Sequence, residues 1–181
     1  MEEAAILAWA KENQLWLPEA RFIVTYAPSY IAEGSEQKVY LNPDGKTVTK
    51  RNTGCYHSTW LEFFLRLIVH QATFPSTAYT VTGFTETEGQ LCVIVQQAWF
   101  NVDRGAPEEE TDAFLSQYGF VNLEYNEFYS KEHGIILDDL HDENVLMGNE
   151  DNLVVIDPII YLETPEMRLG GKSLFHFPYE T

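Results

Sequence analysis

A loop rich in carboxylates, enclosed by short apolar strands, is the feature that most constrains the fold of this chain. Apolar runs predict one strand before the loop and two after it, at residues 134–137, 145–147 and 153–156. Asp139 and Asn144 stand five positions apart in the loop, and Asp157 directly follows the last strand. The residues 148–152 are typical of a turn, so the last two strands form a hairpin. We therefore expect these three polar side chains to converge.

This combination of side chains suits the transfer of a phosphoryl group. One carboxylate orients the attacking hydroxyl, while an amide and a second carboxylate hold the metal ions that bridge phosphate oxygens. Asp139 and Asn144 taken alone are also compatible with ordinary solvated or capping residues of a loop. Two roles are open for His141: it could ligate a metal with a neighbouring aspartate, or brace the loop through a backbone hydrogen bond, which is the commoner role.

The residues before position 100 predict an antiparallel sheet with helices. The patterns indicate, in chain order, an amphipathic helix within 2–16, a hairpin of strands 37–41 and 46–50, a helix at 57–70, and strands 79–87 and 90–97. Pro18 and Pro28 favour an extended passage between the first helix and the hairpin. A sheet of this kind needs a helix packed on it to bury its apolar face.

The later part of the chain has a less regular pattern. Residues 107–118 begin with proline and acids and predict a helix. The aromatic segment 120–130 is compatible with either strand or helix, and regular patterning ends after Ile160.

The motif Asp139-Leu140-His141-Asp142-Glu143-Asn144, followed by Asp157, resembles the protein-kinase-like superfamily, whose catalytic loop has the form H-x-D-x-x-x-x-N and precedes a metal-binding D-x-G. The resemblance implies that Asp139 is the catalytic aspartate and that Asn144 and Asp157 are metal ligands. It implies ATP and Mg²⁺ as cofactors. The loop is closest to the aminoglycoside and choline phosphotransferases. Together with residues 33–40 it also resembles the kinase-like domains of polyvalent proteins from phages and mobile elements, over residues 30–162.

The same resemblance implies a set of nucleotide-binding residues in the first half of the chain. Lys50 ends a strand where the phosphate-binding lysine belongs, and Glu62 on the following helix is expected to pair with it. Gly34 and Lys38 lie where a phosphate-covering loop belongs, and Gln97 lies where the hinge between two lobes would fall.

The fold class that follows is α+β, a two-lobed kinase-like fold. Residues 1–28 are expected to form a helical extension, 29–98 a lobe with an antiparallel sheet and one helix, and 99–181 a shortened second lobe that carries the catalytic loop. The residues after Asp157 are too few for a full activation segment, so the platform that holds a substrate is expected to be absent or supplied elsewhere.

Three departures from the kinase pattern bear on activity. Leu137 stands where the superfamily has histidine, and Asp157 is followed by Pro158 rather than by the residues of a D-F-G switch. Gly34 is the only glycine of the phosphate-covering loop, which also contains acids.

Composition narrows the functional classes. The net charge of −17 disfavours binding to nucleic acids and to anionic membranes, and no apolar run is long enough to span a bilayer. Cys55 and Cys92 show no metal-binding or disulfide pattern, so a reduced, cytoplasmic protein is expected. The first hypothesis is an ATP- and Mg²⁺-dependent phosphotransferase acting on a protein or small-molecule hydroxyl. The alternatives are a kinase-like binding or interaction module without turnover, and an acidic protein that mimics DNA.

Overall fold

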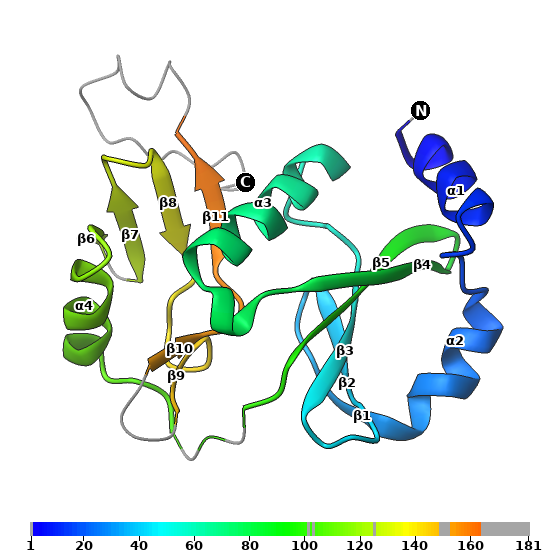
Figure 1. Cartoon of the computed structure of the whole chain (residues 1–181), viewed down its shortest axis with the longest axis horizontal. Helices are drawn as coiled ribbons and strands as arrows, with labels where there is room; N and C mark the ends of the chain where they lie inside the picture. The colour runs from blue at the N-terminus through cyan, green and yellow to red at the C-terminus, as the bar shows by residue number, and fades with distance from the viewer. Residues whose placement is uncertain (1, 101, 103, 125, 149–152, 164–181) are drawn as a thin grey trace. The chain divides into compact units, whose positions relative to one another are not determined.

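The computed structural model describes residues 2–100, 102, 104–124, 126–148 and 153–163 (Figure 1). Its contacts divide the chain into two compact units, which are described separately below. Unit 1 comprises residues 1–103 and 148–154, and unit 2 comprises residues 104–147 and 155–181. The expected turn at 148–152 lies outside the described residues, except for Gly148.

Unit 1 is built on a five-stranded antiparallel sheet with the strand order β1-β2-β3-β5-β4. Its strands are β1 (Tyr30–Glu33), β2 (Gln37–Leu41), β3 (Thr47–Asn52), β4 (Thr80–Thr87) and β5 (Gln90–Ala98). The two expected hairpins are confirmed. In the first, the Asp44 carboxylate accepts hydrogen bonds from the amides of Lys46 and Thr47, and Gly45 adopts the positive φ of 64° that the turn needs.

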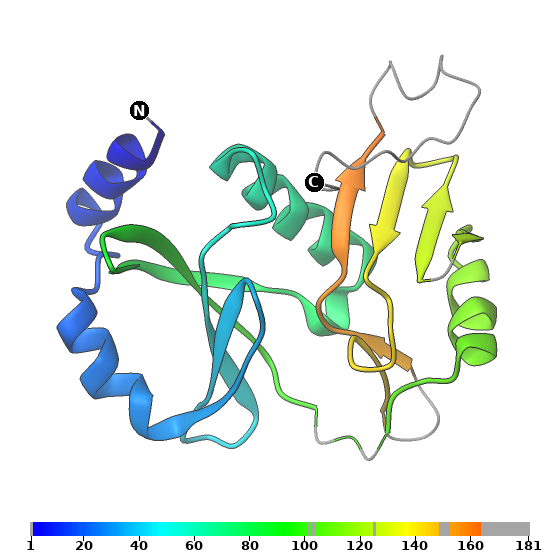
Figure 2. The ribbon, with the colours of Figure 1, turned by 180° about the vertical axis from the view of Figure 1, so that it is seen from behind.

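Three α-helices belong to unit 1, and Figure 2 shows them from behind: α1 (Glu2–Glu12), α2 (Glu19–Tyr26) and α3 (Trp60–Thr73). The first and the third of these helices, α1 and α3, confirm the two helices that the sequence predicts. The prediction of extended chain between Pro18 and Pro28 is wrong, because these residues form α2 and a short 3₁₀ turn. Pro18 stands just before the first helical residue, where the missing amide of proline costs nothing.

Aromatic and aliphatic side chains from α1, α3, β4 and β5 form the main core of unit 1. Ala10, Phe63, Phe84 and Val93 are among its buried members. A second cluster joins Phe22 of α2 to Tyr40 of β2, whose rings meet edge to face at 5.4 Å. The burial of Phe22 explains why α2 forms: its apolar side can pack on the sheet.

The described part of unit 2 contains one helix and a four-stranded antiparallel sheet. The helix is α4 (Glu108–Ser116), and the sheet has the order β11-β8-β7-β6. Its strands are β6 (Val121–Glu124), β7 (Glu127–Ser130), β8 (Ile135–Asp138) and β11 (Ile159–Leu162). Two further short strands follow the catalytic loop in the chain as expected: β9 (Val145–Met147) in unit 2 and β10 (Leu153–Val155), whose first two residues are assigned to unit 1.

The structure resolves one ambiguity and corrects one expectation in unit 2. The aromatic segment 120–130 forms the β6-β7 hairpin, in which Phe128 and Ser130 are buried. Regular structure does not end at Ile160, because Tyr161 and Leu162 continue β11 and pair with Ile136 and Ile135 of β8. With Ile160 as its only buried residue, β11 gives too short a signal to be recognised in a sequence.

Candidate functional site

The catalytic loop begins where β8 ends, at a residue with a strained backbone. Asp139 has φ = 62°, a left-handed conformation that non-glycine residues rarely adopt. The Asp138 carboxylate accepts a hydrogen bond of 2.7 Å from the Asp139 amide and holds it there. The Leu140 amide donates to the Asn126 carbonyl, so the loop is anchored on both sides of Asp139. Strain that is held in this way is typical of a functional position.

Asn144 lies against Asp139, as the spacing predicted. Its side-chain nitrogen donates to the Asp139 backbone carbonyl at 2.8 Å and to the Asp139 carboxylate at 3.1 Å. Because the nitrogen end of the amide is used in this way, the oxygen end is the one that remains able to accept. The loop thus fixes which end of Asn144 it presents.

His141 braces the loop, which confirms the commoner of its two expected roles. Its Nδ1 accepts a hydrogen bond from the Glu143 amide at 3.1 Å, and its carbonyl accepts from the amides of Asn144 and Val145. Its Nε2 lies 3.4 Å from Oδ1 of Asp139. Both ring nitrogens are therefore engaged inside the loop.

Asp157 is electrostatically coupled to this loop. The Ile156 amide donates to the Asn144 carbonyl at 2.9 Å, which ties the residue before Asp157 to the metal-binding candidate Asn144. Burial raises the pKa of the Asp139 carboxyl above its ordinary value. The electrostatic interaction with the His141 side chain opposes that rise. The Asp138 and Asp157 carboxylates add to the rise, whereas the hydrogen bond from Asn144 lowers the pKa. A cation placed among these carboxylates would relieve their mutual repulsion.

Leu137, the departure from the kinase histidine, is a core residue. It is fully buried in β8, where it pairs with Phe128 of β7 and Ile160 of β11. The bracing that a histidine would supply from this position is provided by His141 within the loop itself.

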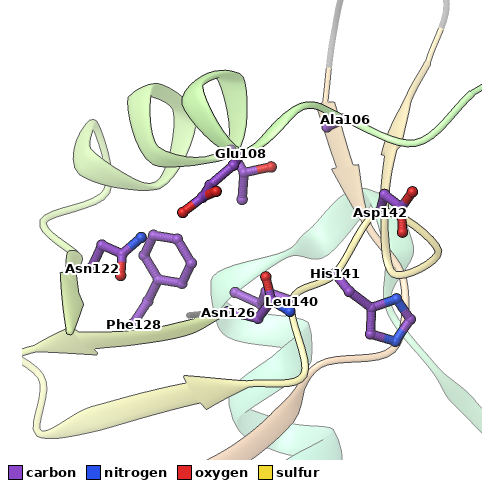
Figure 3. Close-up of a pocket in the computed structure, with 9 residues that line it drawn as sticks. Ala106, Glu108, Asn122, Asn126, Phe128, Leu140, His141 and Asp142 are labelled. Carbon is purple, nitrogen blue, oxygen red and sulfur yellow. The ribbon is translucent and has the colours of Figure 1, made fainter. Parts of the chain in front are cut away.

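Gly105 is a structural requirement of the loop that the sequence interpretation missed. A Cβ atom at this position would lie 1.9 Å from the Asp142 carbonyl oxygen. The segment around Gly105 pairs with β9: the Ala106 amide donates to Val145 at 2.7 Å, and Met147 donates to Arg104 at 3.2 Å. The backbone before α4 therefore packs directly against the catalytic loop (Figure 3). No local pattern marks this glycine, because the contact joins residues far apart in sequence.

Lys50 is buried in the sheet of unit 1. Lys50 is 3% exposed and lies in β3 between Val39 of β2 and Val95 of β5. Its Nζ lies 5.5 Å from the centre of the Tyr79 ring. An ammonium group is almost never buried without a specific role. This burial argues against an ordinary surface lysine at the end of a strand.

Glu62, expected to pair with Lys50, lies at the exposed start of α3. Its Oε2 accepts a hydrogen bond from the Ser58 amide at 2.9 Å, while the Thr59 hydroxyl accepts from the Glu62 amide at 3.1 Å. This reciprocal arrangement is a helix cap. The buried ion pair of α3 is a different one, between Arg66 and Glu36 at 2.8 Å.

The remaining candidates of unit 1 lie in the β1-β2 turn and in β5. The Gly34 amide donates to the Gln37 carbonyl, and a Cβ at Gly34 would meet nothing within 4 Å. Lys38 forms an exposed ion pair with Glu33 at 3.0 Å, which lowers the pKa of Glu33 and raises that of Lys38. The Gln97 side chain is buried and donates to the Thr77 carbonyl at 2.7 Å.

The described residues contain no group of three or more His, Cys, Asp or Glu side chains arranged to hold a metal ion. A set of one amide and one carboxylate is nevertheless typical of Mg²⁺ sites in which phosphate oxygens and water complete the shell. No helix in the described part of the chain is long and apolar enough to cross a membrane.

The fold is a truncated protein-kinase-like fold of the α+β class. Its features are a five-stranded antiparallel sheet with a buried strand lysine, and a loop in which Asn144 contacts Asp139. The model of one family, described as the serine/threonine/tyrosine kinase found in polyvalent proteins, matches residues 1–164. The chain belongs to this family. No curated protein matches the chain.

Family membership confirms the resemblance to the kinase-like domains of polyvalent proteins and supports a kinase-like phosphotransferase function in general. The match begins at residue 1, so it also includes α1 and α2, which lie outside the range of 30–162 on which the resemblance was based. The closer likeness of the loop to aminoglycoside and choline phosphotransferases stays a prediction.

Proposed function

We propose that the chain is an ATP- and Mg²⁺-dependent phosphotransferase that acts on the hydroxyl group of a protein. In this proposal the bond between the γ-phosphorus and the bridging oxygen of ATP breaks, and a bond from that phosphorus to the hydroxyl oxygen forms. Asp139 orients the hydroxyl and receives its proton, and ADP leaves. Small-molecule hydroxyls are the other class of acceptor compatible with the catalytic loop.

The observation that carries the proposal is the orientation of Asn144. Its nitrogen is held by the backbone carbonyl and the carboxylate of Asp139, so its oxygen is the end available to a metal ion. The loop therefore presents one amide oxygen for a metal and one carboxylate for a hydroxyl, which are the two groups that transfer of a phosphoryl group requires. Asp157 is proposed to supply the second protein ligand of the metal.

We propose that Lys50 binds the phosphates of the nucleotide. A buried ammonium that touches an aromatic ring is a strong electrostatic partner for a phosphate, because little water competes with the interaction. Gly34 and Lys38 are proposed to lie over the phosphates, and Gln97 to lie near the base. Glu62 would act on Lys50 only if it left its position as a helix cap.

The test is the variant Asp139→Asn, which keeps the shape of the side chain and an oxygen that can accept the hydrogen bond from Asn144. We expect transfer of ³²P from ATP to protein to fall by about 10²-fold or more, while the affinity for Mg-ATP stays within about threefold. Glu143→Gln removes one charge from the exposed part of the same loop and serves as the control. Equal transfer rates in Asp139→Asn and Glu143→Gln would overturn the assignment.

A second candidate function is nucleotide binding without turnover. It is favoured by the buried Leu137 and by the single glycine of the β1-β2 turn. Stabilisation of the protein by millimolar Mg-ATP, with no ADP or phosphoprotein formed, would support this candidate. The absence of any stabilisation would leave only a role as an interaction module.

A further inference from the structure

The β1-β2 turn, residues 34–36, is tied to the segment of chain that leads from β3 into α3. The Glu36 carbonyl accepts hydrogen bonds from the amide and the hydroxyl of Thr53, at 2.9 and 3.0 Å. The Ser35 and Tyr56 hydroxyls are hydrogen-bonded to each other. This segment runs directly from the end of β3 to the start of α3 (Figure 2). A movement of the turn would therefore break contacts with the chain that enters α3.

A buried ion pair links the turn to α3 directly. Glu36 and Arg66 are 6% and 5% exposed, and Nη1 of Arg66 donates to Oε2 of Glu36 at 2.8 Å. The His57 Nε2 lies 3.0 Å from the same arginine nitrogen and 3.8 Å from Oε1 of Glu36. Because a guanidinium only donates hydrogen bonds, the His57 nitrogen accepts and the imidazole is neutral. Burial and the charge of Arg66 agree with this, since both lower the pKa of His57.

Stability alone does not account for this buried pair. Burying an ion pair takes both charges out of water, and a well-packed apolar pair of similar size is often as stable or more stable. The Oε1 atom of Glu36 adds to the cost, because it is buried and no hydrogen bond to it is found among the described residues. What an ion pair of this kind does supply is a fixed arrangement of the two elements that it joins.

The place of the turn matters because it precedes the strand that pairs with Lys50. β2 begins directly after Glu36, and Val39 of β2 pairs with Lys50 of β3. Glu62 was expected to connect α3 with this lysine, but its side chain caps α3 instead. The ion pair of Arg66 is therefore the contact through which α3 reaches the turn that is proposed to cover the phosphates.

We infer that the Arg66–Glu36 pair positions the β1-β2 turn over the phosphates of the nucleotide. Both are positioning residues, because their side chains are too deeply buried to touch a nucleotide themselves. His57 holds the guanidinium of Arg66 on its other side. A turn that is already fixed loses little conformational freedom when a ligand binds, and this raises the affinity for that ligand. The inference rests on the proposed function, and it names the contact by which α3 acts on the phosphates.

A purely structural role for the pair is the competing explanation. The double variant Glu36→Leu with Arg66→Met separates the two roles, because apolar side chains of similar length replace both charges and neither is left unpaired. If the pair only stabilises unit 1, this variant should regain both stability and binding of the nucleotide. If the pair positions the turn, the midpoint of urea unfolding should recover relative to Arg66→Met alone, whereas binding should stay weak.

Ile94→Ala is the matched control for loss of stability. Ile94 is 3% exposed and lies in the second cluster of unit 1, with Phe22 and Tyr40. Its truncation creates a cavity in that cluster and should destabilise unit 1 about as much as Arg66→Met does, without removing any contact of the turn. An effect on the turn that appears in the double variant but not in Ile94→Ala therefore belongs to the ion pair.

The first measurement compares Mg-ATP with adenosine, which lacks phosphates, by titration calorimetry on the full chain. We expect the double variant to bind Mg-ATP about tenfold more weakly than the wild type and adenosine within about twofold. Ile94→Ala should bind both ligands within about twofold of the wild type. Wild-type affinity for Mg-ATP in the double variant would overturn the inference, as would equal losses for Mg-ATP and adenosine.

The second measurement, hydrogen exchange, reports the turn without any nucleotide. The amide of Gly34 donates to the Gln37 carbonyl and that of Thr53 to the Glu36 carbonyl, each at 2.9 Å. Both amides should exchange about tenfold faster in the double variant than in the wild type or in Ile94→Ala. Unchanged exchange in the double variant would overturn the inference. Faster exchange there, in a protein whose wild type does not bind Mg-ATP, would instead contradict the proposed function and leave the link between α3 and the turn standing.

Discussion

Gly105→Ala is expected to disrupt the catalytic loop although it adds only one methyl group. The new Cβ would lie 1.9 Å from the Asp142 carbonyl oxygen and 2.6 Å from the Asp142 Cβ, whereas ordinary contacts begin near 3.4 Å. The loop or the segment before α4 must therefore shift by about 1.5 Å. The carbonyl belongs to the backbone and the backbone fixes the position of the Asp142 Cβ, so no side-chain rotation can relieve the contact.

The cost of that shift follows from the contacts it breaks. The hydrogen bonds from Ala106 to Val145 and from Met147 to Arg104 are worth about 1 kcal/mol each. Overpacking adds about 1–3 kcal/mol. A local loss of about 3 kcal/mol corresponds to roughly 10²-fold faster hydrogen exchange at the amides of Ala106 and Met147. A displacement of the loop by more than about 1 Å should lower phosphoryl transfer by about 10²-fold as well.

Hydrogen exchange followed by mass spectrometry measures the first effect directly, and ³²P transfer measures the second. Gly119→Ala is the matched control, because a Cβ there meets nothing within 4 Å and only the positive φ of 77° is unfavourable. The control should lose about 1 kcal/mol and keep its activity. Wild-type exchange at Ala106 and Met147 in Gly105→Ala would refute the proposed close contact.

Three other predictions concern charged groups. Arg66→Met removes the closer ion-pair partner of Glu36, a residue only 6% exposed, and leaves it His57 at 3.8 Å, so it should destabilise unit 1 by about 3–5 kcal/mol. Urea unfolding followed by tryptophan fluorescence reports unit 1, which contains all four tryptophans. The double variant with Glu36→Leu should recover part of that loss, and an equal loss in both variants would contradict a buried pair. Burial, with help from Asp138 and Glu124, raises the pKa of Glu127 to about 7, so its stabilising effect is complete below about pH 4.5 and is lost as the pH rises through 7. Glu127→Gln should therefore raise the free energy of unfolding by about 1 kcal/mol at about pH 8.5, after allowance for exposure, and leave it unchanged near pH 4.5. Melting temperatures at the two pH values measure this, and a gain at both would contradict it. Lys38→Met breaks an exposed pair and should change stability by less than about 0.5 kcal/mol, so a clear loss of Mg-ATP affinity in titration calorimetry would assign Lys38 to the nucleotide.

The catalytic loop was predictable because its signal is local. Asp139 and Asn144 lie in one short segment between strands, and their spacing alone predicts that a loop can bring them into contact. The structure confirms that contact at 3.1 Å. Four of the five strands of unit 1 were equally predictable, since turn residues such as those at 42–45 mark where a hairpin reverses, whereas β1 was not expected.

The parts that could not be predicted depend on contacts between distant residues. Nothing near Gly105 in the sequence indicates that its backbone must touch Asp142. The helix α2 is not predictable from its prolines, since proline favours extended chain as well as helix starts, and here Pro18 precedes a helix whose Phe22 is buried beside Tyr40. Glu62 was assigned by its position on α3, but the same position also suits a helix cap, and sequence spacing does not separate the two roles.

In the proposed mechanism, Asn144 and Asp157 hold the metal of a bound nucleotide. Replacing Mg²⁺ with paramagnetic Mn²⁺ measures this, because Mn²⁺ broadens the NMR signals of nearby nuclei. With Mn-ATP bound, the signals of the Asn144 side-chain amide and of the Asp157 backbone amide should disappear, and Asp157→Asn should weaken the binding of Mn-ATP by about tenfold or more. Sharp signals from both residues at saturating Mn-ATP would show that neither of them holds the metal.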